Sequence, residues 1–194
     1  PDVFVKHIEK FMEHNADAPF FVYYPMVLTH DPFVPTPWSK RPVGEDEHKS
    51  YFKDMVKYMD YLVGRIADKT KQLKIDDNTV IIFIGDNGTS PKITSNFKGS
   101  QYAGGKGLTT QRGTHVPMIV NGAAVGKKGS VNKSLIDFTD FLPTLLDLSG
   151  ARKPDSLLLD GMSFLPQLKG QEATGREWIF CAYDPRWGQA KART

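Results

Sequence analysis

The residues best suited to chemistry follow an apolar run near the middle of the chain. The run Val80–Ile84 leads into Gly85, Asp86, Asn87 and Gly88. A short apolar run that ends at a glycine is typical of a buried parallel strand, and ligands bind beyond the carboxyl ends of such strands. The carboxylate of Asp86 and the amide of Asn87 offer oxygen ligands for Ca²⁺ or Mg²⁺. Asp-Asn-Gly is also ordinary turn chemistry, so the tripeptide alone leaves a metal site and a turn open.

Two further candidate residues, His30 and Lys106, lie in segments expected to be loops. His30 follows the aromatic and β-branched run 20–28 and precedes a loop with three prolines, which hold the chain extended. Lys106 lies in the sequence Gly-Gly-Lys-Gly, and a lysine between glycines can reach an anion that the backbone approaches closely. The segment lacks the spacing of a P-loop. Taken alone, each residue is more often an ordinary exposed loop side chain.

The elements that must position these residues alternate between helix and strand. Apolar periodicity predicts three helices, over 3–12, about 47–73 and 137–150, with Asp137 or Thr139 as the cap of the last. Short β-branched and aromatic runs predict strands over 20–28, 80–84, 116–120, 131–136 and 178–183. A helix, a short turn and a buried strand form an α/β unit. We therefore predict an α/β fold with a mainly parallel sheet flanked by helices.

Composition narrows the classes of function. The chain has 194 residues and a formal net charge of +3, with its basic residues scattered, so we expect no nucleic-acid partner. No apolar run approaches the ~20 residues of a membrane span. The single cysteine, Cys181, excludes an internal disulfide and reads as a packed or surface thiol. Because the chain begins with Pro1 rather than Met and its first predicted helix starts almost at once, at Val3, we expect it to be part of a longer protein.

Four segments, in the same order along the chain, resemble the second half of the catalytic domain of the sulfatase family, within the alkaline-phosphatase-like superfamily. The resemblance covers about residues 1–170 and implies a partial catalytic domain, with 171–194 as a C-terminal strand and tail that could begin a small subdomain. Several ordered motifs are more specific than any one of them. The segments are Phe20-Phe-Val-Tyr-Tyr-Pro25 with His30, Asn78 to Gly88, Gly104-Gly-Lys-Gly107 with Arg112-Gly-Thr-His-Val-Pro117, and Asp137 to Leu148 with Asp160-Gly161.

The resemblance implies a role for each candidate residue. Asp86 and Asn87 would bind a divalent cation, usually Ca²⁺, with Mg²⁺ as the other option. Lys106 would hold a sulfate oxygen, His30 would contact the ester and help the leaving oxygen depart, and His115 would lie in the substrate pocket. The family's nucleophile, a formylglycine made from Cys or Ser, is expected in a missing N-terminal part. Asn rather than His beside Asp86 favours one oxygen-liganded Ca²⁺ over a two-metal zinc phosphatase site.

Three departures from the family pattern limit what this chain can do alone. The segment Cys181-Ala-Tyr-Asp-Pro-Arg186 does not match the formylglycine motif, and the N-terminal acidic pair that completes the metal shell is absent. Gln111 stands where an acid is common, and His115 stands where Arg is common. We therefore expect a sulfuric ester hydrolase in the parent protein, and no activity from these 194 residues without the remainder of the catalytic domain.

Substrate, compartment and reaction class stay open at this point. The resemblance implies a sulfated small molecule or a sulfated carbohydrate as substrate, and a periplasmic, secreted or lysosomal location. One alternative is a phosphatase, phosphodiesterase or phosphonate hydrolase of the same superfamily. A second is a non-catalytic protein that binds sulfated glycans through Lys106 and His30. The identity of the missing nucleophile distinguishes these functions.

Overall fold

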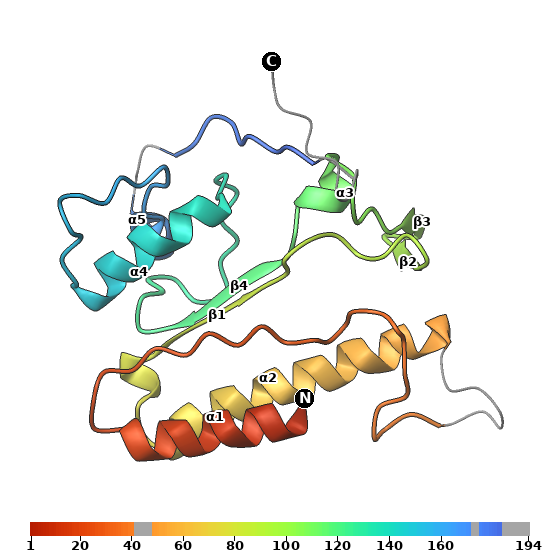
Figure 1. Cartoon of the computed structure of the whole chain (residues 1–194), viewed down its shortest axis with the longest axis horizontal. Helices are drawn as coiled ribbons and strands as arrows, with labels where there is room; N and C mark the ends of the chain where they lie inside the picture. Colours follow the sequence, from red (N-terminus) through yellow and green to blue (C-terminus); the bar gives the residue numbers. More distant parts are fainter. Residues whose placement is uncertain (41–47, 172–174, 184–194) are drawn as a thin grey trace. The chain divides into compact units, whose positions relative to one another are not determined.

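The computed structural model describes residues 1–40, 48–171 and 175–183 (Figure 1). Its contacts divide the chain into two compact units. The first unit contains Pro1–Asp77, Gly85–Pro117 and Tyr183, and the second contains Asn78–Ile84 and Met118–Ala182. No helix in the described ranges is long and apolar enough to cross a membrane.

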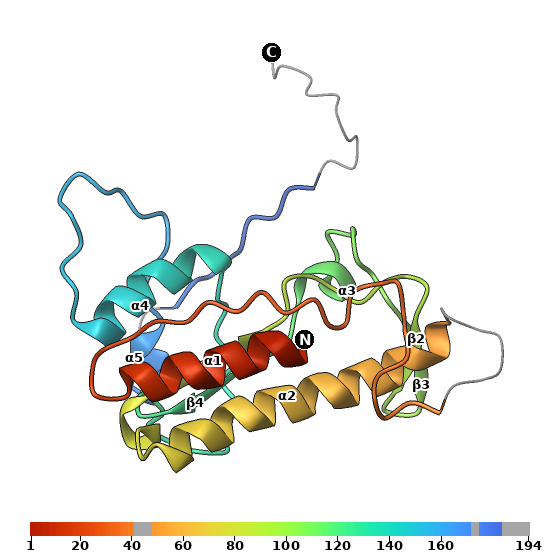
Figure 2. The ribbon, with the colours of Figure 1, turned by 60° about the horizontal axis from the view of Figure 1, so that its bottom comes forward.

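Two helices that lie side by side form the base of the first unit (Figure 2). They are α1, Asp2–Asn15, and α2, Phe52–Gln72, which follows a 3₁₀ turn over Lys49–Tyr51. Val5 from α1 packs against Tyr58 and Leu62 from α2, and all three are buried. The Tyr58 hydroxyl donates to Asp2 Oδ1 at 2.6 Å, and burial together with this hydrogen bond raises the pKa of Tyr58 to about 12.

Both predicted helices of this unit form, with two corrections. Phe4 and Phe11, apolar residues of the predicted helix, are exposed and contact Tyr24 and Phe20, with ring centroids 6.3 and 5.9 Å apart. Val5 is buried instead, where it packs against α2. The second helix begins later than predicted, after the 3₁₀ turn, and its predicted first residue, Glu47, lies outside the described residues.

The segment 20–28 is extended but is not a strand, so that prediction is wrong for the described part of the chain. Its burial alternates residue by residue, as in a strand with one covered face, although the sequence of the segment is apolar throughout. Tyr24, Met26 and Leu28 pack against the α1–α2 core, while Tyr23 is 80% exposed. The segment has the alternating burial of a strand, but no described strand pairs with its backbone.

The glycine-rich segment of the first unit contains short elements that the sequence did not predict. A hairpin joins β2, Thr94–Phe97, to β3, Ser100–Ala103, in antiparallel register. Its turn residues Lys98 and Gly99 have φ of 51° and 81°, the left-handed pair that a tight two-residue hairpin needs. A short helix, α3, follows at Gln111–Thr114. The prediction that no long regular element lies here is confirmed.

The second unit contains the apolar run that precedes Asp86 and Asn87. It forms β1, Val80–Ile84, which pairs antiparallel with β4, Met118–Gly122. Both sheets in the described ranges are antiparallel pairs, so the predicted mainly parallel sheet is not confirmed. The helix-turn-strand pattern predicts that β1 exists, but the direction of its neighbour depends on the long connection before β4.

The second unit also contains a helical segment and a later short helix. A 3₁₀ turn over Phe138–Asp140 leads into α4, Phe141–Ser149, and α5 follows at Leu165–Leu168. Asp137 caps this segment by accepting from Thr139 N at 2.9 Å, as predicted. In place of the predicted strands over 131–136 and 178–183, the described backbone forms one isolated bridge, Leu135 to Arg176.

Candidate active site

The loops that carry most of the predicted site residues meet backbone to backbone. In the first unit, Gly88 N donates to Gly113 O at 2.9 Å, and Lys106 N donates to Thr89 O at 2.9 Å. Gly85 N donates to Pro117 O at 3.0 Å. These hydrogen bonds join the segment after β1 to the two segments that contain Lys106 and α3.

Three glycines allow this close approach, and we call them the glycine cluster: Gly88, Gly104 and Gly113. A Cβ added to Gly88 would lie 2.0 Å from Arg112 O, and one added to Gly104 would lie 2.1 Å from Ser90 O. At Gly113 the distance to Leu108 O would be 1.9 Å. Any side chain would force these backbone segments apart. Close packing of the backbone therefore explains the glycine content of the segment 85–113.

The glycine cluster brings together four of the five predicted site residues. Asp86 and Asn87 directly precede Gly88, the backbone of Lys106 is bonded to Thr89, and His115 follows α3, with its N–H donating to Gln111 O at 3.0 Å. Asp86, Lys106 and His115 are exposed, and Asn87 is half-buried. The arrangement presents one carboxylate, one amide, one ammonium and one imidazole on a single group of loops.

The oxygen donors of Asp86 and Asn87 suit a hard cation, but they are too few to hold it alone. Ca²⁺ takes about 6–8 oxygen ligands. In the ranges that the structure describes, no group of three or more His, Cys, Asp or Glu side chains is placed to hold a metal ion. The chemistry of the two residues therefore fits part of a calcium or magnesium shell, which would need further ligands.

The fifth predicted residue, His30, belongs to a separate cluster with Asp31 and Lys92. Its Nδ1 lies 2.6 Å from the backbone oxygen of Asp31 and 3.3 Å from Asp31 Oδ1. The other carboxylate oxygen, Oδ2, accepts from Lys92 Nζ at 2.9 Å. The hydrogen bond from Lys92 holds the pKa of Asp31 below its usual range, so the carboxylate is charged at neutral pH.

A buried contact connects this cluster to the loops of the glycine cluster. Ile93, next to Lys92, packs in a core group with Phe33, Tyr51 and Met55. The backbone oxygen of Ile93 accepts from Gly104 N at 2.9 Å. The loop of His30 and the loop of Lys106 are therefore both anchored through Ile93.

Asp31 and Lys92 were missed by the sequence analysis. The two residues are 61 positions apart, and each lies in a segment whose composition marks only a polar loop. No spacing rule relates such a pair, because the contact depends on the core around Ile93. Proximity to His30 along the chain was the one available signal for Asp31.

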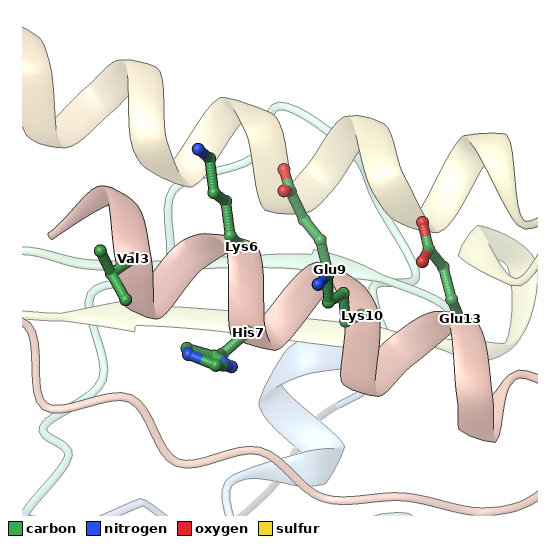
Figure 3. A pocket seen from close by; sticks show the side chains of 6 residues that line it. All are labelled: Val3, Lys6, His7, Glu9, Lys10 and Glu13. Carbon is green, nitrogen blue, oxygen red and sulfur yellow. The ribbon is translucent and has the colours of Figure 1, made fainter.

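A shallow hollow on α1 is a poor candidate for the site. It has a volume of about 340 Å³ and is lined by Val3, Lys6, His7, Glu9, Lys10 and Glu13, all from one helix (Figure 3). Glu9 already pairs with Arg65 at 2.6 Å, and Glu13 pairs with Lys69 at 2.9 Å. The hollow contains none of the residues that the sequence singled out.

Comparison with known proteins identifies the family. The family model described as Sulfatase matches residues 1–151. This chain belongs to the sulfatase family. Among the relatives of this sulfatase chain, an N-acetylgalactosamine-6-sulfatase of Canis lupus familiaris is 30% identical over 166 residues, which are 84% of this chain and 31% of the relative. Steryl-sulfatase of Homo sapiens is 28% identical over 178 residues, or 88% of this chain and 30% of that protein.

Solved structures match the fold of this chain. Ps i-CgsB, crystallised in complex with k-i-k-neocarrahexaose, matches with a TM-score of 0.71 and 26% identity, over 88% of this chain and 38% of that one. A Bacteroides thetaiotaomicron structure described with the metabolism of multiple glycosaminoglycans has a TM-score of 0.68 at 23% identity, which supports the fold. The sulfatase chain therefore spans about a third of the length of these relatives and contains part of their fold.

Proposed function

We propose that the natural protein containing this chain hydrolyses sulfate monoesters, and that these residues supply part of its active site. The observation that carries the proposal is the glycine cluster, which gathers Asp86, Asn87 and Lys106 on adjoining loops in a chain of the sulfatase family. A sulfate ester needs its spread negative charge neutralised before and during transfer. The ammonium group of Lys106, together with a divalent cation on the oxygen atoms of Asp86 and Asn87, fits that need.

Lys106 and His115 contact the bound ester in this proposal. The Lys106 ammonium holds a sulfate oxygen and counters the charge that grows as the bond to sulfur breaks. His115, exposed on the adjoining loop, faces the organic part of the substrate. Asp86 and Asn87 hold a divalent cation, Ca²⁺ or Mg²⁺, which supplies further charge neutralisation when bound.

His30 supplies the proton for the leaving alcohol. A backbone carbonyl can only accept a hydrogen bond, so the 2.6 Å contact with Asp31 O assigns the Nδ1 proton to His30. Nε2 is then the ring nitrogen left for the substrate, and it donates only when the ring is an imidazolium. A positioned acid of this kind contributes about 10²–10⁴-fold to a rate.

The nucleophile lies outside these residues in the proposal, as a formylglycine in the remainder of the catalytic domain. The net reaction consumes water and a sulfate monoester and releases an alcohol and hydrogen sulfate. We therefore expect these 194 residues alone to release no sulfate from p-nitrophenyl sulfate, and turnover by the isolated chain would contradict this.

A sulfated carbohydrate is the substrate class that the comparisons favour. One relative is named N-acetylgalactosamine-6-sulfatase, and a solved structure that matches this chain contains k-i-k-neocarrahexaose. Steryl-sulfatase and arylsulfatases are also relatives, so an aryl or steryl sulfate is the alternative that a substrate panel must include. Preferential release of sulfate from N-acetylgalactosamine 6-sulfate over p-nitrophenyl sulfate would support the carbohydrate assignment.

Substitution of Lys106 tests the proposed function. In the full-length natural protein, Lys106→Met should lower kcat/KM for sulfate release by about 10²–10³-fold, because a charge-stabilising donor is lost. Lys98→Met, at an exposed lysine of the hairpin turn, is the matched control and should leave kcat/KM unchanged. An unchanged rate in Lys106→Met would overturn the assignment of Lys106.

The same assays separate the competing functions. Faster hydrolysis of p-nitrophenyl phosphate than of p-nitrophenyl sulfate would indicate a phosphatase of the same superfamily. Binding of sulfated oligosaccharides with no release of sulfate would indicate a non-catalytic glycan-binding protein. Removal of divalent cations with EDTA should abolish sulfate release, and Ca²⁺ should restore it.

A further inference from the structure

The carboxylate of Asp31 lies between the imidazole of His30 and the ammonium group of Lys92. Its Oδ1 is 3.3 Å from His30 Nδ1, and its Oδ2 is 2.9 Å from Lys92 Nζ. The Asp31 side chain is 32% exposed, while those of His30 and Lys92 are 62% and 61% exposed. Each carboxylate oxygen therefore contacts a different partner in a solvated loop.

Stability does not account for this arrangement. Exposed ion pairs contribute little to folding, because water and salt screen them and two long side chains lose freedom when they are held. The core around Ile93 already fixes the two loops that carry Asp31 and Lys92. The contacts of Asp31 with His30 and Lys92 therefore act mainly to orient these side chains.

Asp31 holds the ring of His30 from one side. The backbone oxygen and the carboxylate of Asp31 both face Nδ1, so the ring has two acceptors at one nitrogen. Such contacts select the tautomer with the proton on Nδ1 and orient the ring, as carboxylates do for catalytic histidines generally. Without the carboxylate, the exposed ring keeps only the contact with a carbonyl of the neighbouring residue.

Lys92 holds Asp31 from the other side. Lys92 precedes Ile93, whose backbone oxygen is bonded to Gly104, two residues before Lys106. The ammonium therefore reaches Asp31 from a segment that is itself bonded to the loop of Lys106. Movement of either loop would change the direction in which the His30 ring points.

We propose that Asp31 is a positioning residue for His30, and that Lys92 fixes the Asp31 carboxylate in the orientation that this role requires. The inference rests on the proposed sulfatase function. As the bond between sulfur and the ester oxygen breaks, its electron pair passes to that oxygen, which takes the Nε2 proton of His30. The ring becomes neutral and keeps its Nδ1 proton directed at Asp31. The sulfuryl group would pass to a hydroxyl of the formylglycine hydrate, hydrogen sulfate would leave as the aldehyde re-forms, and water would restore the hydrate.

The test compares two leaving groups in the full-length natural protein. p-Nitrophenolate leaves without help from an acid, whereas the alcohol of N-acetylgalactosamine 6-sulfate needs a proton. Asp31→Asn should lower kcat for the sugar sulfate by about tenfold to a hundredfold and kcat for p-nitrophenyl sulfate by less than about threefold, with KM little changed. Lys92→Met should shift the same ratio in the same direction by a smaller factor.

The matched control is Asp68→Asn, which breaks an exposed pair with Lys71 at 3.2 Å, distant in sequence from His30. It should leave both values of kcat unchanged. Equal losses on the two substrates in Asp31→Asn, a loss in KM alone, or no loss would overturn the positioning role.

A second measurement keeps the proposal separate from the proposed function. In protein labelled with ¹³C at histidine Cε1, the order parameter of the His30 ring should fall in Asp31→Asn and in Lys92→Met, and should stay at the wild-type value in Asp68→Asn. An unchanged order parameter would overturn the positioning role even in an active sulfatase. Absence of sulfate release by the wild-type protein would overturn the proposed function, whatever the ring does.

Discussion

Asp31 in the first unit and Asp140 in the second both use two carboxylate oxygens to join distant segments, but their surroundings differ. The Asp140 side chain is 2% exposed. It accepts from Arg176 Nε at 2.9 Å, from Met162 N at 2.8 Å and from Asp137 N at 2.8 Å. The Asp31 side chain is 32% exposed, and among the residues that the structure describes it contacts the side chains of Lys92 and His30.

The difference shows how burial decides what an ion pair contributes. Removal of one partner from a buried pair leaves the other charge without water or a counter-charge, so the cost to stability is large. Removal of one partner from an exposed pair leaves a solvated charge, so the cost is small. We therefore expect Asp140 to act on the free energy of unfolding and Asp31 to act on the orientation of a neighbour.

The largest expected effect follows from Asp140→Ala. The substitution should lower the free energy of unfolding by about 3–5 kcal/mol, because it leaves Arg176 without its partner and two backbone N–H groups without their acceptor. Urea denaturation of wild type and variant measures the loss. Asp147→Ala, at an exposed position of α4, is the control and should change stability by less than about 0.5 kcal/mol. Equal losses in the two variants would contradict a special role for Asp140.

The next effect follows from Thr144→Val, within the same core. Thr144 is fully buried, and its hydroxyl donates to Asp140 O at 2.6 Å and accepts from Phe164 N at 3.0 Å. Valine keeps the shape but leaves Phe164 N without an acceptor, so stability should fall by about 1–3 kcal/mol. The exposed Ser149→Ala, which loses one hydroxyl contact with Leu146 O, should cost far less in the same denaturation experiment.

A pH dependence should accompany the Asp140 pair. Burial alone would raise the pKa of Asp140, but hydrogen bonds from Arg176 and two backbone N–H groups outweigh it and lower that pKa. A carboxyl group with a lowered folded-state pKa contributes stability that is present above its unfolded pKa of about 3.9. That contribution is lost as the pH falls through the folded-state pKa. The free energy of unfolding should therefore fall more steeply with acid below about pH 4 in wild type than in Asp140→Asn.

The smallest effect on stability is expected for Asp31→Asn. Its urea midpoint should match that of wild type and of Asp68→Asn, since both substitutions break exposed pairs. A clear loss of stability in Asp31→Asn, absent from Asp68→Asn, would show that the two aspartates differ less than their burial suggests. Its effect should instead appear in the ratio of rates for the two leaving groups.

Local patterns in the sequence were sufficient to predict the elements that depend on near neighbours. Helices α1 and α2, strand β1 and the cap at Asp137 follow from apolar periodicity, an apolar run and a capping side chain. The strand predicted over 20–28 has the alternating burial of a strand, but pairing requires a second backbone that local sequence does not specify. The antiparallel direction of β4 is non-local for the same reason.

The site shows the same division between local and distant information. Residue types and their order were enough to select Asp86, Asn87 and Lys106 as candidates, and the close approach of their loops depends on backbone contacts at Gly88 and Gly104. The ordered motifs were also enough to predict the sulfatase family, which is confirmed. The contact of Asp31 with Lys92 could not be predicted, because it joins loops that only the Ile93 core brings together.

The β2–β3 hairpin offers a place to re-engineer this protein. Residues 94–102 are all exposed, and the positive φ of Lys98 and Gly99 restricts only the turn, whereas the glycine cluster a few residues away admits no side chain. A library that randomises the exposed strand positions of the hairpin and leaves Gly88, Gly99, Gly104 and Gly113 unchanged should therefore yield mostly folded variants.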